Sequence, residues 1–318
     1  MIELHEHKFW TARSAQLGGL LWVGIVLAAQ GGRVPIGIIE QLLLLAPLVI
    51  VPLGFLLINR LYLREQRHFA HQLASRLQPF AALLVVASFW LMPGMLVASL
   101  TLPWFLVSGL AGFARLSDVR RRGLSRIEDV CLDAGSFYLV VGAAWLIVSR
   151  FGGHLLGFDE PIVLLTAVHF HYTGFALPLI TAALGQALNR LSPRAYPLFR
   201  WIAIGVIGSP PLIAIGFVFS PLLQMIAVMW LTASVVGLSV LSFRVLPRLH
   251  HRLAKALVSI SATSGLVGMA FVGVYAVGEF TGQWWLSISH MARTHGVINA
   301  VGLTLCGLLA WLMESPQP

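Results

Sequence analysis

The sequence predicts an all-α membrane protein, a polytopic bundle of transmembrane helices. Hydrophobic residues make up 58% of the 318-residue chain and charged residues only 10%, whereas soluble domains carry roughly 25% charged residues. The apolar residues also gather in long runs, and a helix needs about 20 of them to cross the hydrocarbon core. The 2 cysteines both lie in such runs, so they indicate neither a disulfide framework nor a metal–thiolate motif.

About ten apolar runs have the length of a membrane span. The first follows a polar N-terminus in which Glu3 and Glu6 argue against a signal peptide, so we expect it to be retained as a helix. Tight turns are predicted at Pro93-Gly94 and at Ser220-Pro221. The expected spans, in chain order, are Ser14–Gln30, Pro35–Ile58, Gln78–Met92, Gly94–Phe113, Ile127–Ser149, Pro161–Ala187, Tyr196–Phe219, Pro221–Phe243, Leu253–Gly278 and Met291–Met313.

The basic residues predict the orientation of these spans. Cytoplasmic loops carry an excess of Lys and Arg, and with a cytoplasmic N-terminus 18 basic residues lie inside and 3 outside. A missed helix would place basic loops on both sides of the membrane. The observed alternation of basic and non-basic loops therefore supports ten spans, and we expect both termini in the cytoplasm. The net charge of +9 then reflects topology and requires no nucleic-acid partner. The outer residues are Arg33, Arg150 and Arg293; the inner ones are Lys8, Arg13, Arg60, Arg64, Arg67, Arg76, Arg115, Arg120, Arg121, Arg122, Arg126, Arg190, Arg194, Arg200, Arg244, Arg248, Arg252 and Lys255.

No internal repeat and no soluble domain are evident. We therefore expect a single transmembrane helical domain over residues 1–318.

Several polar side chains lie within the apolar runs. Ionisable groups at membrane depth are rare, and each is a functional hypothesis by default. The ionisable candidates are Glu40, Asp133, His169, His171 and His295, and their neutral companions are Tyr172 and Asn299.

The two histidines of HFHYTGF pose a geometric problem. His169 and His171 lie roughly 13–17 Å from the outer edge but are separated by about 200° around a regular helix. Either one is a ligand or base while the other is buried between helices, or the helix is broken locally, which Gly174 and Pro178 would allow. A two-histidine metal motif on a helix prefers a spacing of three or four, so HFH is a weak metal signal.

Depth along the spans suggests which side chains meet. His295 and Asn299 are four residues apart and share one helix face, about 7 and 13 Å deep. We expect Asp133 to meet His171 from the cytoplasmic side, or alternatively to pair with Arg126. A single pocket that opens outward is expected to hold Glu40, His169, His295 and Asn299.

Three stretches of the chain resemble the YndJ-like membrane proteins of bacteria. They are DAGSFYLVVGAAW at 133–145, HFHYTGFALPL at 169–179 and THGVINAVG at 294–302. The resemblance implies a polytopic bacterial membrane protein, which we expect in the cytoplasmic (inner) membrane, and it implies no substrate. The positions that it marks are Asp133, His169, His171, His295 and Asn299.

The first functional hypothesis is an integral membrane enzyme. Histidines and carboxylates in a dry cavity can act as general bases and acids, which would suit isomerisation or cyclisation of a hydrophobic, lipid-like or isoprenoid-like substrate. In this reading His169 or His295 is the base, Asp133 or Glu40 the acid, and His171, Tyr172 and Asn299 bind the substrate.

Two alternatives remain open. In a haem or metal protein, histidines from two helices would be ligands, although the sequence assigns no particular cofactor. In a proton-coupled transporter, an intramembrane relay would carry protons, with helices broken at Pro178 and at Pro210-Pro211. A charged path through the inner half of the membrane is missing from the sequence, apart from Asp133.

Overall fold

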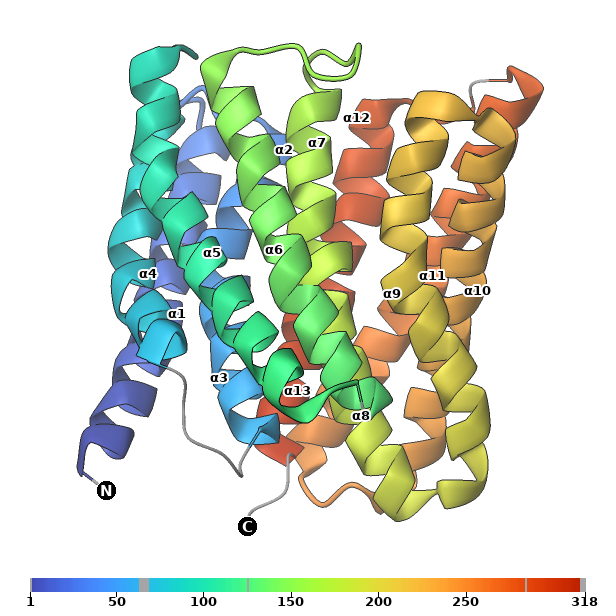
Figure 1. Ribbon diagram of the computed structural model, residues 1–318. Coiled ribbons are helices and arrows are strands. Elements are labelled where there is room, and N and C mark those ends of the chain that lie inside the picture. Colours follow the sequence, from blue (N-terminus) through green and yellow to red (C-terminus); the bar gives the residue numbers. More distant parts are fainter. Residues whose placement is uncertain (1, 63–68, 125, 284, 315–318) are drawn as a thin grey trace. The chain divides into compact units, whose positions relative to one another are not determined.

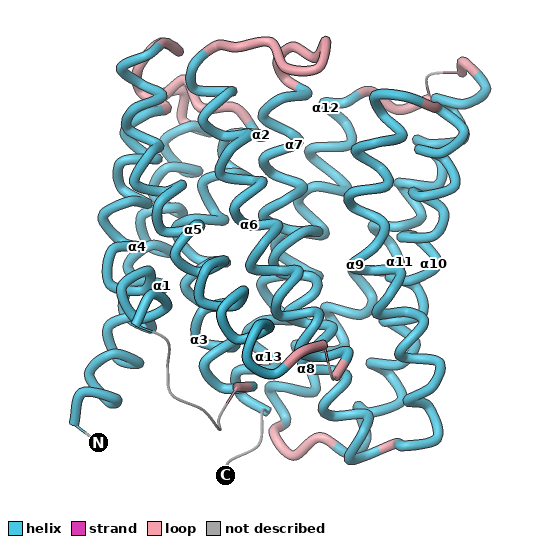
Figure 2. Tube along the Cα trace, viewed as in Figure 1, coloured by secondary structure: helices cyan, strands magenta, loops and turns pink. Residues whose placement is uncertain are grey.

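The computed structural model describes residues 2–62, 69–124, 126–283 and 285–314, which form helices joined by short loops and contain no β-strand (Figure 2). The contacts divide the chain into two compact units. Unit 1 comprises Met1–Leu124 and Leu132–Ala176, and unit 2 comprises Ser125–Cys131 and Leu177–Pro318. Each unit is described by itself below, and the single domain stays a prediction.

Unit 1 contains α1, α4, α5, most of α6, and two spans that are interrupted by π-helical turns. In these turns the helix widens and its hydrogen-bond register changes, a feature that is frequent at functional sites. The bounds are α1 Ile2–Gln30, α2 Ile38–Leu45, η1 Ala46–Ile50, α3 Val51–Leu61, α4 Phe69–Ser88, α5 Met95–Arg122, α6 Ile127–Phe151, α7 Ile162–His169 and η2 Phe170–Ala176 (Figure 1).

Unit 2 continues the span that α7 and η2 begin. Within it α10 packs against both α9 and α11. Helix α11 packs along the last span, which has two further π-helical segments. The bounds are α8 Leu177–Leu191, η3 Pro193–Ala195, α9 Tyr196–Phe219, α10 Pro221–Val245, η4 Leu246–Arg248, α11 Arg252–Thr281, α12 Ile288–Met291, η5 Ala292–Gly296, η6 Ile298–Leu305 and α13 Cys306–Glu314.

The all-α polytopic class is confirmed, because 9 helical runs in the described part of the chain are long and apolar enough to cross a membrane. The expected third span, Gln78–Met92, is not among them. Its helix, α4, starts at Phe69 and has 20 residues, and Arg76 and Gln78 in its first half lower its hydropathy. The segment after Ser88 forms a turn instead of continuing the helix. Since α4 lies along α5 within unit 1 (Figure 1), its crossing stays a prediction.

The two expected tight turns are confirmed. At the first, Gly94 directly precedes α5. At the second, Ser220 caps α10, since its hydroxyl accepts a hydrogen bond from the Leu223 N–H at 3.3 Å, and Pro221 occupies the first helical position, which suits proline. This turn brings α9 and α10 together at Gly216, where a Cβ would lie 2.3 Å from the Gln224 nitrogen.

The expected break at Pro210-Pro211 is wrong. Helix α9 runs without interruption through both prolines, from Tyr196 to Phe219. Membrane helices tolerate proline where neighbouring groups satisfy the carbonyls that it frees. Pro178, in contrast, does follow a local change of helix type, because α8 begins directly after η2.

The orientation of the termini also stays a prediction, and two of the residues counted for it, Arg64 and Arg67, lie outside the described residues.

We expect α4 to cross the membrane, so that the two ends of α4 face opposite sides. A cysteine introduced as Met92→Cys, at a position 88% exposed, would then react with a membrane-impermeant maleimide from outside intact cells. A cysteine introduced as Phe69→Cys, at a position 74% exposed, would react only after permeabilisation. Reaction of both cysteines from the same side would show that α4 stays on one side.

Candidate functional site

His171 is enclosed at the centre of unit 1. It is fully buried, and its Nδ1 lies 2.7 Å from the Ala167 carbonyl. The Trp104 indole N–H, which can only donate, lies 3.0 Å from Nε2. The ring is therefore neutral, with its proton on Nδ1, and both nitrogens are used. Its two partners differ from Asp133, so the expected contact between Asp133 and His171 does not form.

Glycine allows α6 to approach η2 closely at this point. A Cβ on Gly142 would lie 2.8 Å from His171 Nδ1, and a Cβ on Gly174 would lie 2.9 Å from the Tyr138 Cβ. Both distances are shorter than ordinary packing allows. Gly142 is therefore a position where two helices pack closely.

Side chains donate hydrogen bonds to backbone carbonyls where the π-helical turns change the regular backbone hydrogen bonding of the helix. The Tyr172 hydroxyl donates to the Leu42 carbonyl at 2.7 Å. In η1 the Val51 N–H bonds to the Ala46 carbonyl, five residues back. In the same register Pro47 would need the N–H of residue 52, which is a proline and has none.

Gln78 supplies the missing donor to Pro47. Its amide nitrogen lies 2.7 Å from the Pro47 carbonyl, and its amide oxygen accepts from the Ser14 hydroxyl at 2.8 Å. Gln78 was not among the sequence candidates. The signal was present, since prolines five residues apart in a membrane span leave a carbonyl without a donor.

His169 differs from His171 in its surroundings. It is exposed at the surface of the described chain, and its Nδ1 lies 2.7 Å from the Leu165 carbonyl. Its Nε2 has no hydrogen-bond partner among the described residues. His171 is thus buried and His169 faces outward, and the helix type changes between them. The structure therefore combines the two alternatives that the sequence left open, a buried histidine and a local break of the helix.

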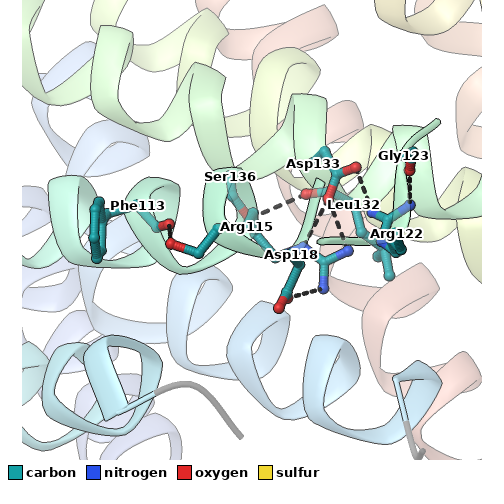
Figure 3. A network of polar contacts seen from close by, with 9 residues as sticks. Phe113, Arg115, Asp118, Arg122, Gly123, Leu132, Asp133 and Ser136 are labelled. Atoms are coloured by element: carbon teal, nitrogen blue, oxygen red, sulfur yellow. Dashed lines mark hydrogen bonds and ion pairs between the residues drawn. The ribbon is translucent and has the colours of Figure 1, made fainter. Parts of the chain in front are cut away.

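Asp133 belongs to a network of charges between α5 and α6 (Figure 3). One carboxylate oxygen lies 2.9 Å from Arg115 Nε and 2.8 Å from its Nη2, and the other lies 2.5 Å from Arg122 Nη2. Asp118 accepts from Arg115 at 3.3 Å. Because α5 extends to Arg122, Arg115 is buried rather than in a loop as expected.

The alternative partner expected for Asp133 was Arg126. Arg126 instead lies 3.9 Å from Glu128, a fully buried carboxylate in unit 2 that also accepts from the Tyr196 hydroxyl at 3.0 Å. The sequence analysis did not single out Glu128.

Tyr62 covers the charge network in unit 1. The Arg115 guanidinium lies 4.4 Å from the centre of the Tyr62 ring, a cation–π contact. Burial raises the pKa of the Tyr62 phenol, Asp118 acts in the same direction, and Arg115 and Arg122 lower it. The phenol therefore stays neutral at physiological pH.

Glu40 lies at the N-terminus of α2, with its carboxylate folded back beside Gly37. A negative charge is stabilised at this end of a helix. The negative charges of Glu40 and Glu160 interact electrostatically with Arg150. Arg150 is 9% exposed, and its guanidinium lies 4.5 Å from the centre of the Phe89 ring. Asp133 and Arg150 are 17 residues apart on α6, or about 25 Å.

His295 and Asn299 meet in unit 2, as their spacing predicted. The Asn299 amide nitrogen lies 2.8 Å from His295 Nδ1 and 3.3 Å from Nε2, and Nδ1 also lies 3.0 Å from the Gly268 carbonyl on α11. The Asn299 amide oxygen is buried and has no hydrogen-bond partner among the described residues. Gly268 is required here, because a Cβ would lie 2.5 Å from that oxygen.

The sequence candidates thus divide between the two units. Unit 1 contains Glu40, Asp133, His169, His171 and Tyr172, and unit 2 contains His295 and Asn299. A pocket common to both sets therefore stays a prediction, as do the catalytic and substrate-binding roles. Within the described ranges, no three His, Cys, Asp or Glu side chains gather as a metal-binding group.

We expect Gly142→Ala to lower the melting temperature in detergent. The added methyl group would overpack the site against His171, which costs about 1–3 kcal/mol. The control is Gly109→Ala on α5, where a Cβ meets nothing within 4 Å. Equal melting temperatures for the two variants would contradict the close approach.

We expect Asp133→Asn to destabilise the protein more than Asp118→Asn does. Loss of the Asp133 charge removes the carboxylate that Arg115 and Arg122 share and leaves Arg115 with Asp118. Breaking a buried ion pair costs about 3–5 kcal/mol. Asp118 contacts Arg115 alone in this network, so its loss should cost less. Thermal unfolding in mild detergent measures both, and a larger effect at Asp118 would refute this assignment.

The comparisons with known proteins agree with this architecture. The chain is 28% identical, over 306 residues, to the uncharacterized membrane protein YndJ of Bacillus subtilis (strain 168). The alignment covers 96% of this chain and 54% of that protein, so the chain spans about half the length of this relative. No solved structure matches. The YndJ-like family matches residues 41–303, and the chain therefore belongs to the YndJ-like family of membrane proteins.

Proposed function

We propose that the protein carries protons across the membrane and that His295 is the group that takes them up. The observation that carries this proposal is the pair of His295, in the π-helical segment η5, and Asn299, in the π-helical segment η6, within the last span. Histidine is the side chain whose charge changes most readily near neutral pH. The inner membrane of a bacterium, where a proton gradient is available, is part of the proposal.

The Asn299 amide can serve both charge states of His295. When the imidazole is neutral, its Nδ1 either donates to the Gly268 carbonyl or accepts from the Asn299 amide nitrogen, according to the tautomer. When it is protonated, both ring nitrogens are donors. The amide would then turn and offer its oxygen, which has no donor in the described structure.

The surroundings of His295 leave it as the proton acceptor of this segment. Other titratable groups on its own span are His290 and Arg293 near the start and Cys306 and Glu314 toward the end. On α11, which packs against η5, Tyr275 and Glu279 lie about 10 Å or more further along the helix from Gly268.

We expect His295→Ala to reduce proton flux at least tenfold. Purified protein in liposomes, with an internal pH dye and an imposed potassium diffusion potential, measures the flux directly. His290→Ala is the matched control, because His290 lies at the start of the span and contacts Ser287. Unchanged flux in His295→Ala, with wild-type flux above that of empty liposomes, would reject the role of His295. Absence of flux from the wild type would reject proton transport.

A second candidate is a membrane enzyme that performs acid–base isomerisation or cyclisation on a lipid-like substrate. It is favoured by the exposed His169, whose Nε2 is available, beside a chain of rings. Phe137 is 63% exposed and contacts Tyr138, which contacts Phe170. Mass spectrometry of lipids that co-purify with the wild type and with His169→Ala would test it, and identical lipid profiles would count against it.

A further inference from the structure

Small residues line the seam between α11 and the last span in unit 2. A Cβ on Gly302 would lie 2.1 Å from the Ser264 hydroxyl, and one on Gly307 would lie 2.9 Å from the Ser261 hydroxyl. The seam thus brings serine hydroxyls of α11 directly against the backbone of η6 and α13. It begins at the His295 and Asn299 pair, where α11 contributes Gly268.

A small cavity lies at the far end of this seam. The centre of a water molecule can occupy a volume of about 10 Å³ inside it. The polar side chains that line it are Ser239, Ser242, Ser261 and Trp311. Space of this size holds about one water molecule, provided that two to four polar groups can bind it.

The three hydroxyl groups differ in their bonding. Ser242 donates to the Leu238 carbonyl at 2.9 Å and Ser261 to the Leu303 carbonyl at 2.7 Å, so each keeps its oxygen lone pairs available. Ser239 is 2% exposed, and its hydroxyl has no hydrogen-bond partner among the described residues. A buried hydroxyl without a partner is costly, and this one borders the cavity.

The chemistry of the lining favours a neutral ligand. No carboxylate is among the lining residues, so a cation would lose its hydration without a compensating charge. Water, in contrast, can accept from Ser239 and donate to the oxygens of Ser242 and Ser261, which are three hydrogen bonds, the usual number for a buried water.

We propose that Ser239, Ser242 and Ser261 hold one water molecule that relays protons along the seam, an inference that rests on the proton transport proposed above. One lone pair of the water takes up a proton while one of its two original O–H bonds releases a proton. Water is therefore regenerated. Asn299 lies about 6 Å along the helix from Leu303, and Ser264 lies between them beside Gly302. Beyond Trp311, the Glu314 carboxylate accepts from the backbone N–H of His250 at 2.7 Å.

The substitution Ser239→Val tests the site, because it removes the hydroxyl and fills the space of the water. The control is Ser259→Val, which makes the same change on α11 at a hydroxyl bonded to the Lys255 carbonyl. Ser239→Ala, which removes the hydroxyl without adding bulk, is the second variant in case the valine variant does not fold.

Two measurements on the 318-residue chain separate the presence of the water from its role in transport. In radiolytic hydroxyl labelling, Trp311, which is 3% exposed, should be labelled by the bound water in the wild type and several-fold less in Ser239→Val and Ser239→Ala. Proton flux in liposomes should fall at least tenfold in the same variants, and Ser259→Val should change neither readout.

Each outcome bears on one proposal. Equal labelling of Trp311 in the wild type and both Ser239 variants overturns the water site. Reduced labelling with unchanged flux supports the water and overturns its role as a relay. Reduced labelling in a protein whose wild type shows no flux confirms the water and rejects proton transport, and with it the relay.

Discussion

The structure depends on one constraint, which is that every backbone carbonyl inside the hydrocarbon must find a donor within the protein. Regular helices meet it by themselves, but the π-helical segments and the prolines of this chain do not. Side chains supply donors near these points. Gln78 donates to Pro47, Tyr172 to Leu42 and Ser261 to Leu303 from other helices, and His171 donates to Ala167 within its own span.

This constraint explains why polar residues persist in spans that are otherwise apolar. The buried His171 keeps a hydrogen bond at each ring nitrogen, and this combination leaves it little freedom to exchange protons. His295 has the same kind of partner, a carbonyl, but its second partner is an amide that can reverse its polarity. The difference between an indole and an amide as partner therefore separates a structural histidine from a candidate proton acceptor.

Charge in unit 1 follows a related rule. Asp133 lies among Arg115, Arg122 and Asp118, so that two carboxylates balance two guanidinium groups in one network (Figure 3). An isolated charge at this depth would be costly. The network therefore acts as a neutral unit, and it uses both oxygens of Asp133, which reduces the availability of this residue as an acid.

The sequence by itself determined the all-α membrane class, the approximate positions of the spans, the turns at Pro93-Gly94 and Ser220-Pro221, and the pairing of His295 with Asn299. Each of these follows from local composition or from spacing along one helix, which a single sequence contains. Only the tertiary structure decided that His171 is bound by Trp104, that Arg115 and Arg122 take Asp133, and that Gln78 serves Pro47. These contacts join residues on different helices, and their partners depend on how the helices rotate and pack, which the apolar pattern of a membrane span, hydrophobic on all sides, leaves open.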